Sequence, residues 1–418
     1  MTTKKALSSE DSAGDIAWPR TKSFFPASFT RMRDRFAAAF LRVAEFFEAH
    51  PVLSFSLIVI LFVPDVLGRS LVKPLWHDEL FTYYISQSPS LSVLLRDTWT
   101  VDLNPPLSYV LTKISFLLFG VNTLSTRLPE MAGFLLAMLS LFLFVRRRAG
   151  TLYGLVAAVM FYGGSARVLD VEARPYGLLL GFTALSLLAW QKTRAKDRLG
   201  IPLLLLAGFC ILLSHVFSVF VWTALAAAEV ICILRRRRID WPLAIAWTVP
   251  LLCLVTYIPL LRSHGASIFP HDFQPNISSI MEFYVHSAAR QAVFLIVAGL
   301  GLVVLTGHHH PRPDSEWLLT PPESLSTVFL FAAPLLLIFD LMRSHAAFFD
   351  RYGTFESVAV SVIAAVLLAW WTRRDLSAAL LCIVVAVLLS NQLPFAVNAL
   401  LHQHVLTTTE PASSTCEA

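Results

Sequence analysis

Charged side chains gather in four short clusters that interrupt an otherwise apolar chain, at residues 75–80, 102–107, 170–176 and 351–352. A desolvated charge in a membrane protein costs several kcal/mol, so such a cluster usually marks a water-filled site or an anchor at the membrane surface. Together the clusters offer carboxylates that can take a proton and arginines that can bind an anion. They are therefore the first candidates for a reaction centre.

The first cluster contains two adjacent acids, Asp78 and Glu79, preceded by His77. Neighbouring side chains on a helix point about 100° apart, so the two acids cannot both address one atom. We expect one of them to act as a general base and the other to brace an arginine or the backbone. The alternative is that the pair only solvates the end of a helix.

The second cluster holds Asp102 and Asn104 just before Pro105 and Pro106. Proline fixes its own backbone angle and favours an extended conformation in the residue before it. This predicts that Asp102 and Asn104 are held rigidly beside a helix that begins at Pro106. An ordinary loop-to-helix entry with proline in the first turn is the equal alternative.

The third cluster is the most specific, because two acids and an arginine lie within five residues between two apolar segments; its candidate residues are Asp170, Glu172, Arg174 and Tyr176. A guanidinium presents a planar fork that suits a phosphate group. Arg351, which precedes Tyr352 in the fourth cluster, would be a second arginine for the same anion. The alternatives are a surface Glu–Arg pair and tyrosines at the membrane interface.

The composition indicates a membrane protein. Of the 418 residues, 56% are hydrophobic and 15% are charged, whereas soluble domains have about 25% charged residues. The mean hydropathy is +0.65. The net charge of +5 comes from basic residues in short loops between apolar segments, which is the positive-inside pattern rather than a nucleic-acid surface. The sequence therefore predicts an all-α polytopic membrane protein without a nucleic-acid partner.

We expect the chain to have three parts. Residues 1–50 form a cytoplasmic tail with a basic amphipathic helix, from Phe29 onward, that lies on the membrane surface. Residues 51–400 form the membrane domain, and residues 401–418 form a polar C-terminal tail. The apolar segments of the membrane domain predict about eleven spans, near residues 51–68, 127–145, 149–165, 177–191, 201–214, 216–234, 241–261, 291–307, 325–342, 354–372 and 376–400.

The segment 106–119 decides the topology. It is apolar but short for a span, which needs about 20 residues. If it lies in the membrane interface, Arg146–Arg148 and Arg235–Arg238 face the cytoplasm; if it crosses, they face the exterior. The positive-inside bias favours the interfacial position. The N-terminus then lies inside, and all four polar clusters lie on the external side.

Several ordered motifs carry a family resemblance: Asp78-Glu79 after the first span, Asp102-x-Asn104-Pro105-Pro106-Leu107-x-Tyr109, Phe119-Gly120, Arg127-Leu128-Pro129 and Glu172-Ala173-Arg174-Pro175-Tyr176. The chain resembles the bacterial membrane glycosyltransferases of the GT-C fold. Within that fold it is most similar to the protein O-mannosyltransferase-like and lipopolysaccharide-core galacturonosyltransferase-like group. The motifs cover roughly residues 50–190, and Arg351-Tyr352 matches the family pattern more loosely.

The resemblance implies a multi-pass enzyme of the plasma (inner) membrane with interfacial helices in its first external loop. Such an enzyme moves a sugar, with inversion, from a polyprenyl-phosphate carrier to a glycan, lipid or protein acceptor at the external face. Asp78 would be the catalytic base, with Glu79 beside it, and Asp170 a second active-site acid. Arg174 and Arg351 would hold the lipid phosphate.

The implied chemistry suits these residue types. A phosphate-linked sugar already carries a good leaving group, so the reaction needs one carboxylate as base and cations that stabilise the departing phosphate. A divalent metal between Asp78 and Asp170 could share that second task. Family members commonly have histidine where this chain has Asn104, so the resemblance implies only a hydrogen-bonding role for Asn104. The expected substrate-binding residues are Asp102, Asn104, Glu172, Arg174, Tyr176, Arg351 and Tyr352.

A lipid-linked-sugar flippase or transporter without transferase chemistry is the alternative function. Such a protein would carry ionisable residues inside its spans near the midplane, often in paired halves. The sequence has no convincing internal repeat, and its polar clusters are expected at one face. A cavity shared by Asp78, Asp170 and Arg174 would favour the enzyme.

Overall fold

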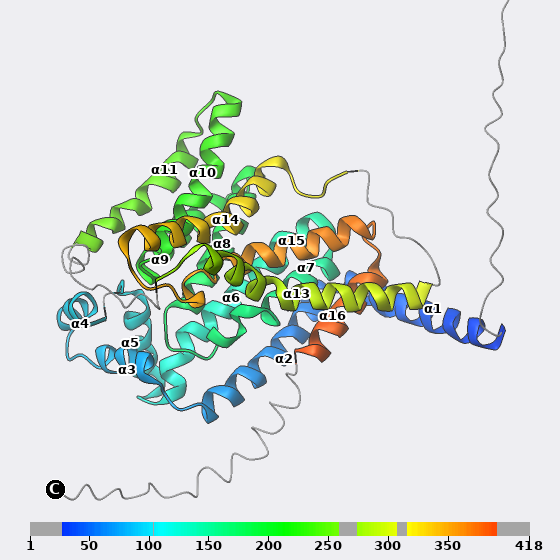
Figure 1. Ribbon diagram of the computed structural model, residues 1–418, viewed down its shortest axis with the longest axis horizontal. Coiled ribbons are helices and arrows are strands. Elements are labelled where there is room, and N and C mark those ends of the chain that lie inside the picture. Colours follow the sequence, from blue (N-terminus) through cyan, green and yellow to red (C-terminus); the bar gives the residue numbers. More distant parts are fainter. Residues whose placement is uncertain (1–26, 103, 259–273, 307–315, 391–418) are drawn as a thin grey trace, which may run out of the picture.

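The computed structural model describes residues 27–102, 104–258, 274–306 and 316–390 (Figure 1). Every regular element in these ranges is a helix, so the predicted all-α architecture is confirmed. The expected polar tail 401–418 and the first 26 residues of the expected cytoplasmic tail lie outside the described residues. The division of the chain into a tail, a membrane domain and a second tail stays a prediction.

The first half of the chain contains α1 (Ala27–Ala49), α2 (Pro51–Val72), α3 (His77–Ser86), α4 (Leu91–Asp97), η1 (Thr98–Asp102), α5 (Leu107–Phe119), α6 (Thr123–Ala149), α7 (Thr151–Tyr162), η2 (Ser165–Leu169) and α8 (Tyr176–Arg194). The second half contains α9 (Gly200–Ser214), α10 (Ser218–Arg236), α11 (Trp241–Thr248), η3 (Val249–Tyr257), α13 (Ile277–Thr306), α14 (Pro321–Ser344), η5 (Asp350–Tyr352), α15 (Glu356–Trp371) and α16 (Leu376–Leu389).

The protein is a multi-pass membrane protein. Five of the described helices are long and apolar enough to cross a membrane, namely α2, α6, α10, α13 as far as Leu302, and α14, and six shorter apolar helices accompany them. Each of the eleven predicted segments overlaps a described helix, although α11 and η3 share the segment 241–261. The predicted ends at 259–261, 307 and 391–400 lie outside the described residues. One boundary differs clearly: α13 begins at Ile277, 14 positions before the predicted segment 291–307.

The core is centred on α6, which packs against α2, α5, α7, α8 and α15. Its contact with α8 depends on glycine, because a Cβ added to Gly177 would lie 2.2 Å from the backbone oxygen of Glu130. A Cβ on Gly181 would likewise lie 2.3 Å from the backbone oxygen of Gly133. Small residues let membrane helices approach this closely, so α8 is fixed tightly to α6.

The helices α3, α4 and α5 lie together at one end of the molecule, at the lower left of Figure 1, away from the turn between α10 and α11. The α5 helix follows Pro106 as predicted and has 13 residues. A helix of that length extends about 20 Å, well short of the ~30 Å hydrocarbon core of a bilayer. Its dimensions therefore fit the interfacial position, which stays a prediction.

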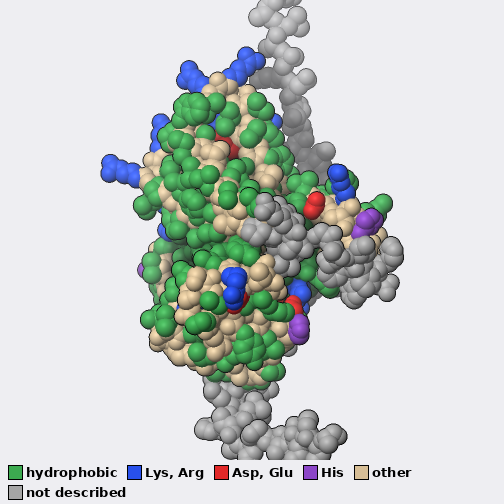
Figure 2. Space-filling model, turned by 90° about the vertical axis from the view of Figure 1, so that its left-hand side faces the viewer, with side chains coloured by type: hydrophobic (Ala, Val, Ile, Leu, Met, Phe, Trp, Pro, Cys, Tyr) green, Lys and Arg blue, Asp and Glu red, His purple; other side chains and the backbone are tan. Residues whose placement is uncertain are grey.

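Figure 2 shows the face that carries these helices. Its surface is largely hydrophobic, and lysine and arginine side chains gather at the upper end, over the turn between α10 and α11. The four consecutive arginines Arg235–Arg238 lie at the end of α10 and the start of that turn. The predicted cytoplasmic arginines and the predicted external helices therefore lie at different ends of the molecule.

The predicted amphipathic helix at the N-terminal end is α1. Met32 and Phe36 on this helix are exposed apolar side chains, which suits a position on a membrane surface. Near its end, the carboxylate of Glu48 accepts hydrogen bonds of 2.8 Å from the backbone N–H groups of Thr151 and Leu152. This contact caps the first turn of α7 and fixes α1 to the membrane domain.

Candidate active site

Asp78 and Arg351 form an ion pair at the end of the molecule that carries α3. The distance from Nη2 of Arg351 to Oδ2 of Asp78 is 2.9 Å, and the two side chains are 26% and 23% exposed. Asp78 lies in the first turn of α3, and η5 supplies Arg351 from 273 positions further along the chain. The predicted base and a predicted phosphate ligand are thus in direct contact and remain accessible.

Aromatic rings surround the guanidinium of Arg351. Its Cζ atom lies 5.3 Å from the ring centre of Trp76, 5.2 Å from that of Phe349 and 5.8 Å from that of Tyr352. Such contacts hold an arginine in place without neutralising its charge. Arg351 therefore keeps a fixed position and a charge that an anion can approach.

Arg174 lies on the other side of Asp78. Its Nη1 donates to the backbone oxygen of Asp78 at 3.1 Å and to Oδ2 of Asp102 at 2.5 Å, while Nη2 donates to Oδ1 of Asp102 at 3.1 Å. Asp102 also accepts a hydrogen bond from the hydroxyl of Tyr109. Asn104 is buried beside it, with Nδ2 3.4 Å from the backbone oxygen of Asp102. The second and third sequence clusters therefore meet at the first.

Glu79 is completely buried, and both of its oxygens are engaged. Nε of Arg127 donates to Oε1 at 2.8 Å and Nη2 of Arg127 donates to Oε2 at 2.7 Å. The backbone N–H of Ala173 also donates to Oε1 of Glu79, at 2.7 Å, and that of Trp76 donates to Oε2, at 3.2 Å. These contacts tie α3 to α6 and to the segment before α8.

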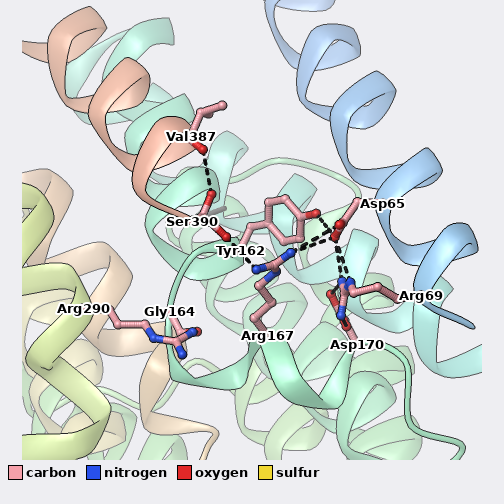
Figure 3. Close-up of polar contacts among 9 residues, drawn as sticks. All are labelled: Asp65, Arg69, Tyr162, Gly164, Arg167, Asp170, Arg290, Val387 and Ser390. Carbon is pink, nitrogen blue, oxygen red and sulfur yellow. Dashed lines mark hydrogen bonds and ion pairs between the residues drawn. The ribbon is translucent and has the colours of Figure 1, made fainter. Parts of the chain in front are cut away.

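Asp170 belongs to a separate buried network, shown in Figure 3. Arg69 binds both of its oxygens, at 2.7 and 2.5 Å, and also donates to Asp65 at 2.7 Å. Asp65 receives further bonds from Arg167, at 3.2 Å, and from Tyr162, at 2.5 Å. Burial raises the pKa of Asp170, and Arg69 opposes this shift. Among the described residues Asp170 and Asp78 share no hydrogen-bond or ion-pair partner, and a common site of the two acids stays a prediction.

Glu172 and Tyr176 have other partners, Lys73 and His215 respectively. Glu172 pairs with Lys73, with 3.3 Å between Oε1 and Nζ, and burial raises the pKa of its carboxyl. Tyr176 is almost fully buried, and its ring packs against His215 with centroids 5.1 Å apart. Tyr352 lies further out, with its ring 6.5 Å from that of His215.

His215 was missed by the sequence analysis. It lies in the loop between α9 and α10, where its Nδ1 accepts a hydrogen bond of 3.1 Å from the backbone N–H of Phe217. Burial lowers the pKa of His215 to about 3, and the charges of Arg174 and Arg351 contribute. The ring is therefore neutral with its proton on Nε2. The sequence signal that could have pointed to His215 is its position as a lone histidine between two predicted spans, on the predicted external side.

The expected divalent metal finds little support in these side chains. Within the described ranges, no group of three or more His, Cys, Asp or Glu residues is arranged to hold a metal ion. Arg351 occupies Asp78, and Arg69 occupies both oxygens of Asp170. We therefore derive no step through a metal.

Comparison with solved structures identifies the architecture. The crystal structure of ArnT from Cupriavidus metallidurans in the apo state is similar to this chain with a TM-score of 0.54 and 14% sequence identity. The structure of ArnT from the same organism bound to undecaprenyl phosphate has a TM-score of 0.51, also at 14% identity. The chain has the GT-C fold.

The GT-C likeness extends over 86% of this chain and 66% of the ArnT chain in both comparisons, so this chain spans less than two thirds of ArnT. No protein-family model matches the sequence. No curated protein matches it either. At 14% identity the likeness shows the GT-C fold, and the finer subgroup stays a prediction.

Proposed function

We propose that this protein is a membrane glycosyltransferase that takes a sugar from a polyprenyl-phosphate-linked donor. The observation that carries the proposal is the ion pair between Asp78 and Arg351, a carboxylate and a phosphate-binding cation in contact at an accessible end of a GT-C fold. The similar ArnT structure was solved with undecaprenyl phosphate bound, which supports a lipid phosphate as ligand. We further propose the plasma (inner) membrane as its location, with the site facing outward.

In the proposed reaction, the phosphate of the donor replaces Asp78 as the partner of Arg351. This exchange frees the Asp78 carboxylate, which takes the proton of an acceptor hydroxyl. The hydroxyl oxygen forms a bond to the anomeric carbon, and the bond from that carbon to the phosphate oxygen breaks. The electron pair leaves with the phosphate, whose charge Arg351 stabilises. Attack opposite to the leaving group inverts the sugar carbon.

The other predicted residues position these two. Asp102 holds both terminal nitrogens of Arg174, and Arg174 in turn holds the backbone of Asp78. Glu79 fixes α3 through Arg127. We therefore assign Asp102, Arg174 and Glu79 to positioning, and Arg351 to phosphate binding. Asp170 is assigned to the internal network of Figure 3.

One observation favours the alternative of a flippase or transporter. The pairs Asp65–Arg69 and Asp65–Arg167 include a buried acid within α2, and ionisable residues inside a span often mark a transport pathway. The proposal for transport would place that network, rather than Asp78, at the centre of function. The experiment below separates the two.

The test is sugar transfer from a polyprenyl-phosphate sugar in liposomes by the wild-type protein and by Asp78→Asn. The substitution keeps the size of the side chain, so we expect a folded protein with about 10²–10⁴-fold slower transfer and retained binding of the donor. Asp97→Asn, on α4, is the matched control and should transfer normally. Wild-type rates in Asp78→Asn would remove the base from the proposal, whereas movement of lipid-linked sugar across the bilayer without any transfer would favour the transporter.

A further inference from the structure

His215 is a polar side chain to which the proposed reaction assigns no role. The residue is 4% exposed. Its ring centre lies 5.1 Å from that of Tyr176, 5.4 Å from that of Phe217 and 6.5 Å from that of Tyr352. These rings come from the start of α8, the residue before α10 and η5. The imidazole is thus held in place by parts of the chain that are far apart in the sequence.

The two ring nitrogens of His215 differ in what they contact. Nδ1 accepts the backbone N–H of Phe217 at 3.1 Å, so the proton of the neutral ring lies on Nε2. This Nε2–H has no hydrogen-bond partner within the described ranges, and it is not one of the unpartnered atoms that the fold closes off from solvent. The Nε2–H therefore keeps accessible surface although most of the ring is buried. Buried rings normally pair their N–H groups, so an unpaired and accessible one indicates a ligand contact.

Two arginines set the charge around this donor. Burial lowers the pKa of His215 to about 3, and the positive charges of Arg174 and Arg351 lower it further in the same direction. Tyr352 connects the groups in space, because its ring centre lies 5.8 Å from Cζ of Arg351 and 6.5 Å from the ring of His215. The charges that act on the imidazole are thus positive, and they come from the two arginines beside Asp78.

A neutral N–H donor near two guanidinium groups suits an anion that has several oxygens. A phosphate group offers more acceptor oxygens than one guanidinium can satisfy, so a further N–H finds a partner on it. A sugar hydroxyl could also accept this N–H, but only an anion is attracted by the two positive charges as well. A hydrocarbon chain offers no acceptor. The surroundings of His215 therefore favour a phosphate oxygen.

We propose that the Nε2–H of His215 donates a hydrogen bond to a phosphate oxygen of the lipid-linked sugar donor. This role rests on the proposed glycosyltransferase function and adds a binding residue from the loop between α9 and α10. The proton stays on Nε2 throughout the reaction. The phosphate gains one negative charge when its bond to the sugar breaks, so the same N–H binds the departing phosphate more strongly than the donor.

The test compares His215→Asn with His215→Gln in the full-length protein in nanodiscs. Both variants lose the ring, and the oxygen of asparagine can still accept the N–H of Phe217. The asparagine amide ends short of the Nε2 position, whereas glutamine is one methylene longer and can place an N–H near it. We expect His215→Asn to bind bare undecaprenyl phosphate about 10- to 100-fold more weakly than the wild type, and His215→Gln to keep most of the affinity.

Thermal unfolding shows first that each variant is folded. If His215→Asn does not fold, His215→Phe replaces it, because phenylalanine keeps a ring and has no N–H to donate. Phe220→Leu is the control, since it removes a ring that packs against Phe217 rather than against His215, with ring centres 6.5 Å apart. It should bind undecaprenyl phosphate as the wild type does.

Equal losses in His215→Asn and His215→Gln would show that only the packing of the ring matters and would overturn the proposal. Wild-type affinity in a folded His215→Asn would overturn it too. A loss confined to undecaprenyl phosphate that carries a sugar, with normal binding of the bare lipid, would assign the N–H to the sugar and reject the phosphate contact. In a wild type that transfers sugar, these outcomes count against His215 alone. A wild type that neither binds undecaprenyl phosphate nor transfers sugar would count against the proposed function itself.

Discussion

At the scale of single residues, the ion pair between Glu79 and Arg127 is the most sensitive contact in the region. Both side chains are completely buried. Removing one partner of a buried ion pair leaves an uncompensated charge and typically costs about 3–5 kcal/mol. We therefore expect Glu79→Gln to lower the midpoint of thermal unfolding in detergent strongly. Glu172→Gln is the comparison, because the Glu172–Lys73 pair is partly exposed and should cost far less.

A second prediction at this scale concerns acid. The pKa of His215 is lowered to about 3, from an ordinary value of 6.5, so the folded protein favours the neutral ring. This contribution to stability is complete above pH 6.5 and is lost as the pH falls toward 3, by about 1.4 kcal/mol per pH unit. His215→Gln removes the group. The unfolding midpoints of the two proteins should differ by a constant amount above pH 7. Below pH 6 the midpoint of the wild type should fall steadily relative to that of His215→Gln. A constant difference down to pH 4 would contradict the assignment.

The grouping of the candidate residues could be predicted in part from the sequence. Asp78, Asp102, Asn104, Arg174 and Arg351 come together although they are widely separated along the chain. Their partners could not be predicted, because the choice between a substrate and a neighbouring carboxylate depends on distances of a few ångströms. Asp170 illustrates this: its motif resembles a site, but Arg69 lies one turn beyond Asp65 on α2 and takes both oxygens.

At the scale of helices, the close approach of α6 and α8 positions the start of α8, which follows Arg174. Gly177→Ala would place a Cβ against backbone at 2.2 Å, so α8 must move away from α6. We expect a clear loss of thermal stability together with weaker donor binding, because Tyr176 and Arg174 shift with α8. Gly299→Ala is the matched control, since nothing lies within 4 Å of its added Cβ. That change should be neutral or stabilise by about 0.5–1 kcal/mol.

The helices themselves were largely predictable, because apolar length is the dominant signal in a membrane protein. The helix after Pro106 begins as expected, with Pro106 as its cap and Leu107 as its first residue. The start of α13 at Ile277 was not predicted, because its first turns carry Ser279, Glu282 and His286 and look like loop by composition. These polar first turns bring His286 and Ser287 to the wall of a cavity between α13 and α15.

At the scale of the whole molecule, the orientation in the membrane follows from the positive-inside bias. We expect Arg147 and the arginines 235–238 to face the cytoplasm and the α3–α5 group to face outward. Single cysteines introduced at the exposed positions 147 and 92 should react differently with a membrane-impermeant maleimide on intact cells. Labelling of position 147 and protection of position 92 would invert the topology and remove the external site from the proposal. The background is a Cys416→Ser protein, because Cys416 lies outside the described residues. The other four native cysteines, at 210, 232, 253 and 382, lie in helices and are largely buried.

Arg351 has a final consequence, which concerns how two ligands influence each other. The guanidinium of Arg351 holds Asp78 through Nη2, and the same residue lines a neighbouring cavity of about 190 Å³ between α13 and α15. A group shared in this way links two binding equilibria. Linkage is mutual, so the factor by which an occupied cavity changes the affinity for a phosphate equals the factor by which that phosphate changes the affinity of the cavity. A single side chain can thus couple the binding of two ligands, and it can do so while every helix stays in place.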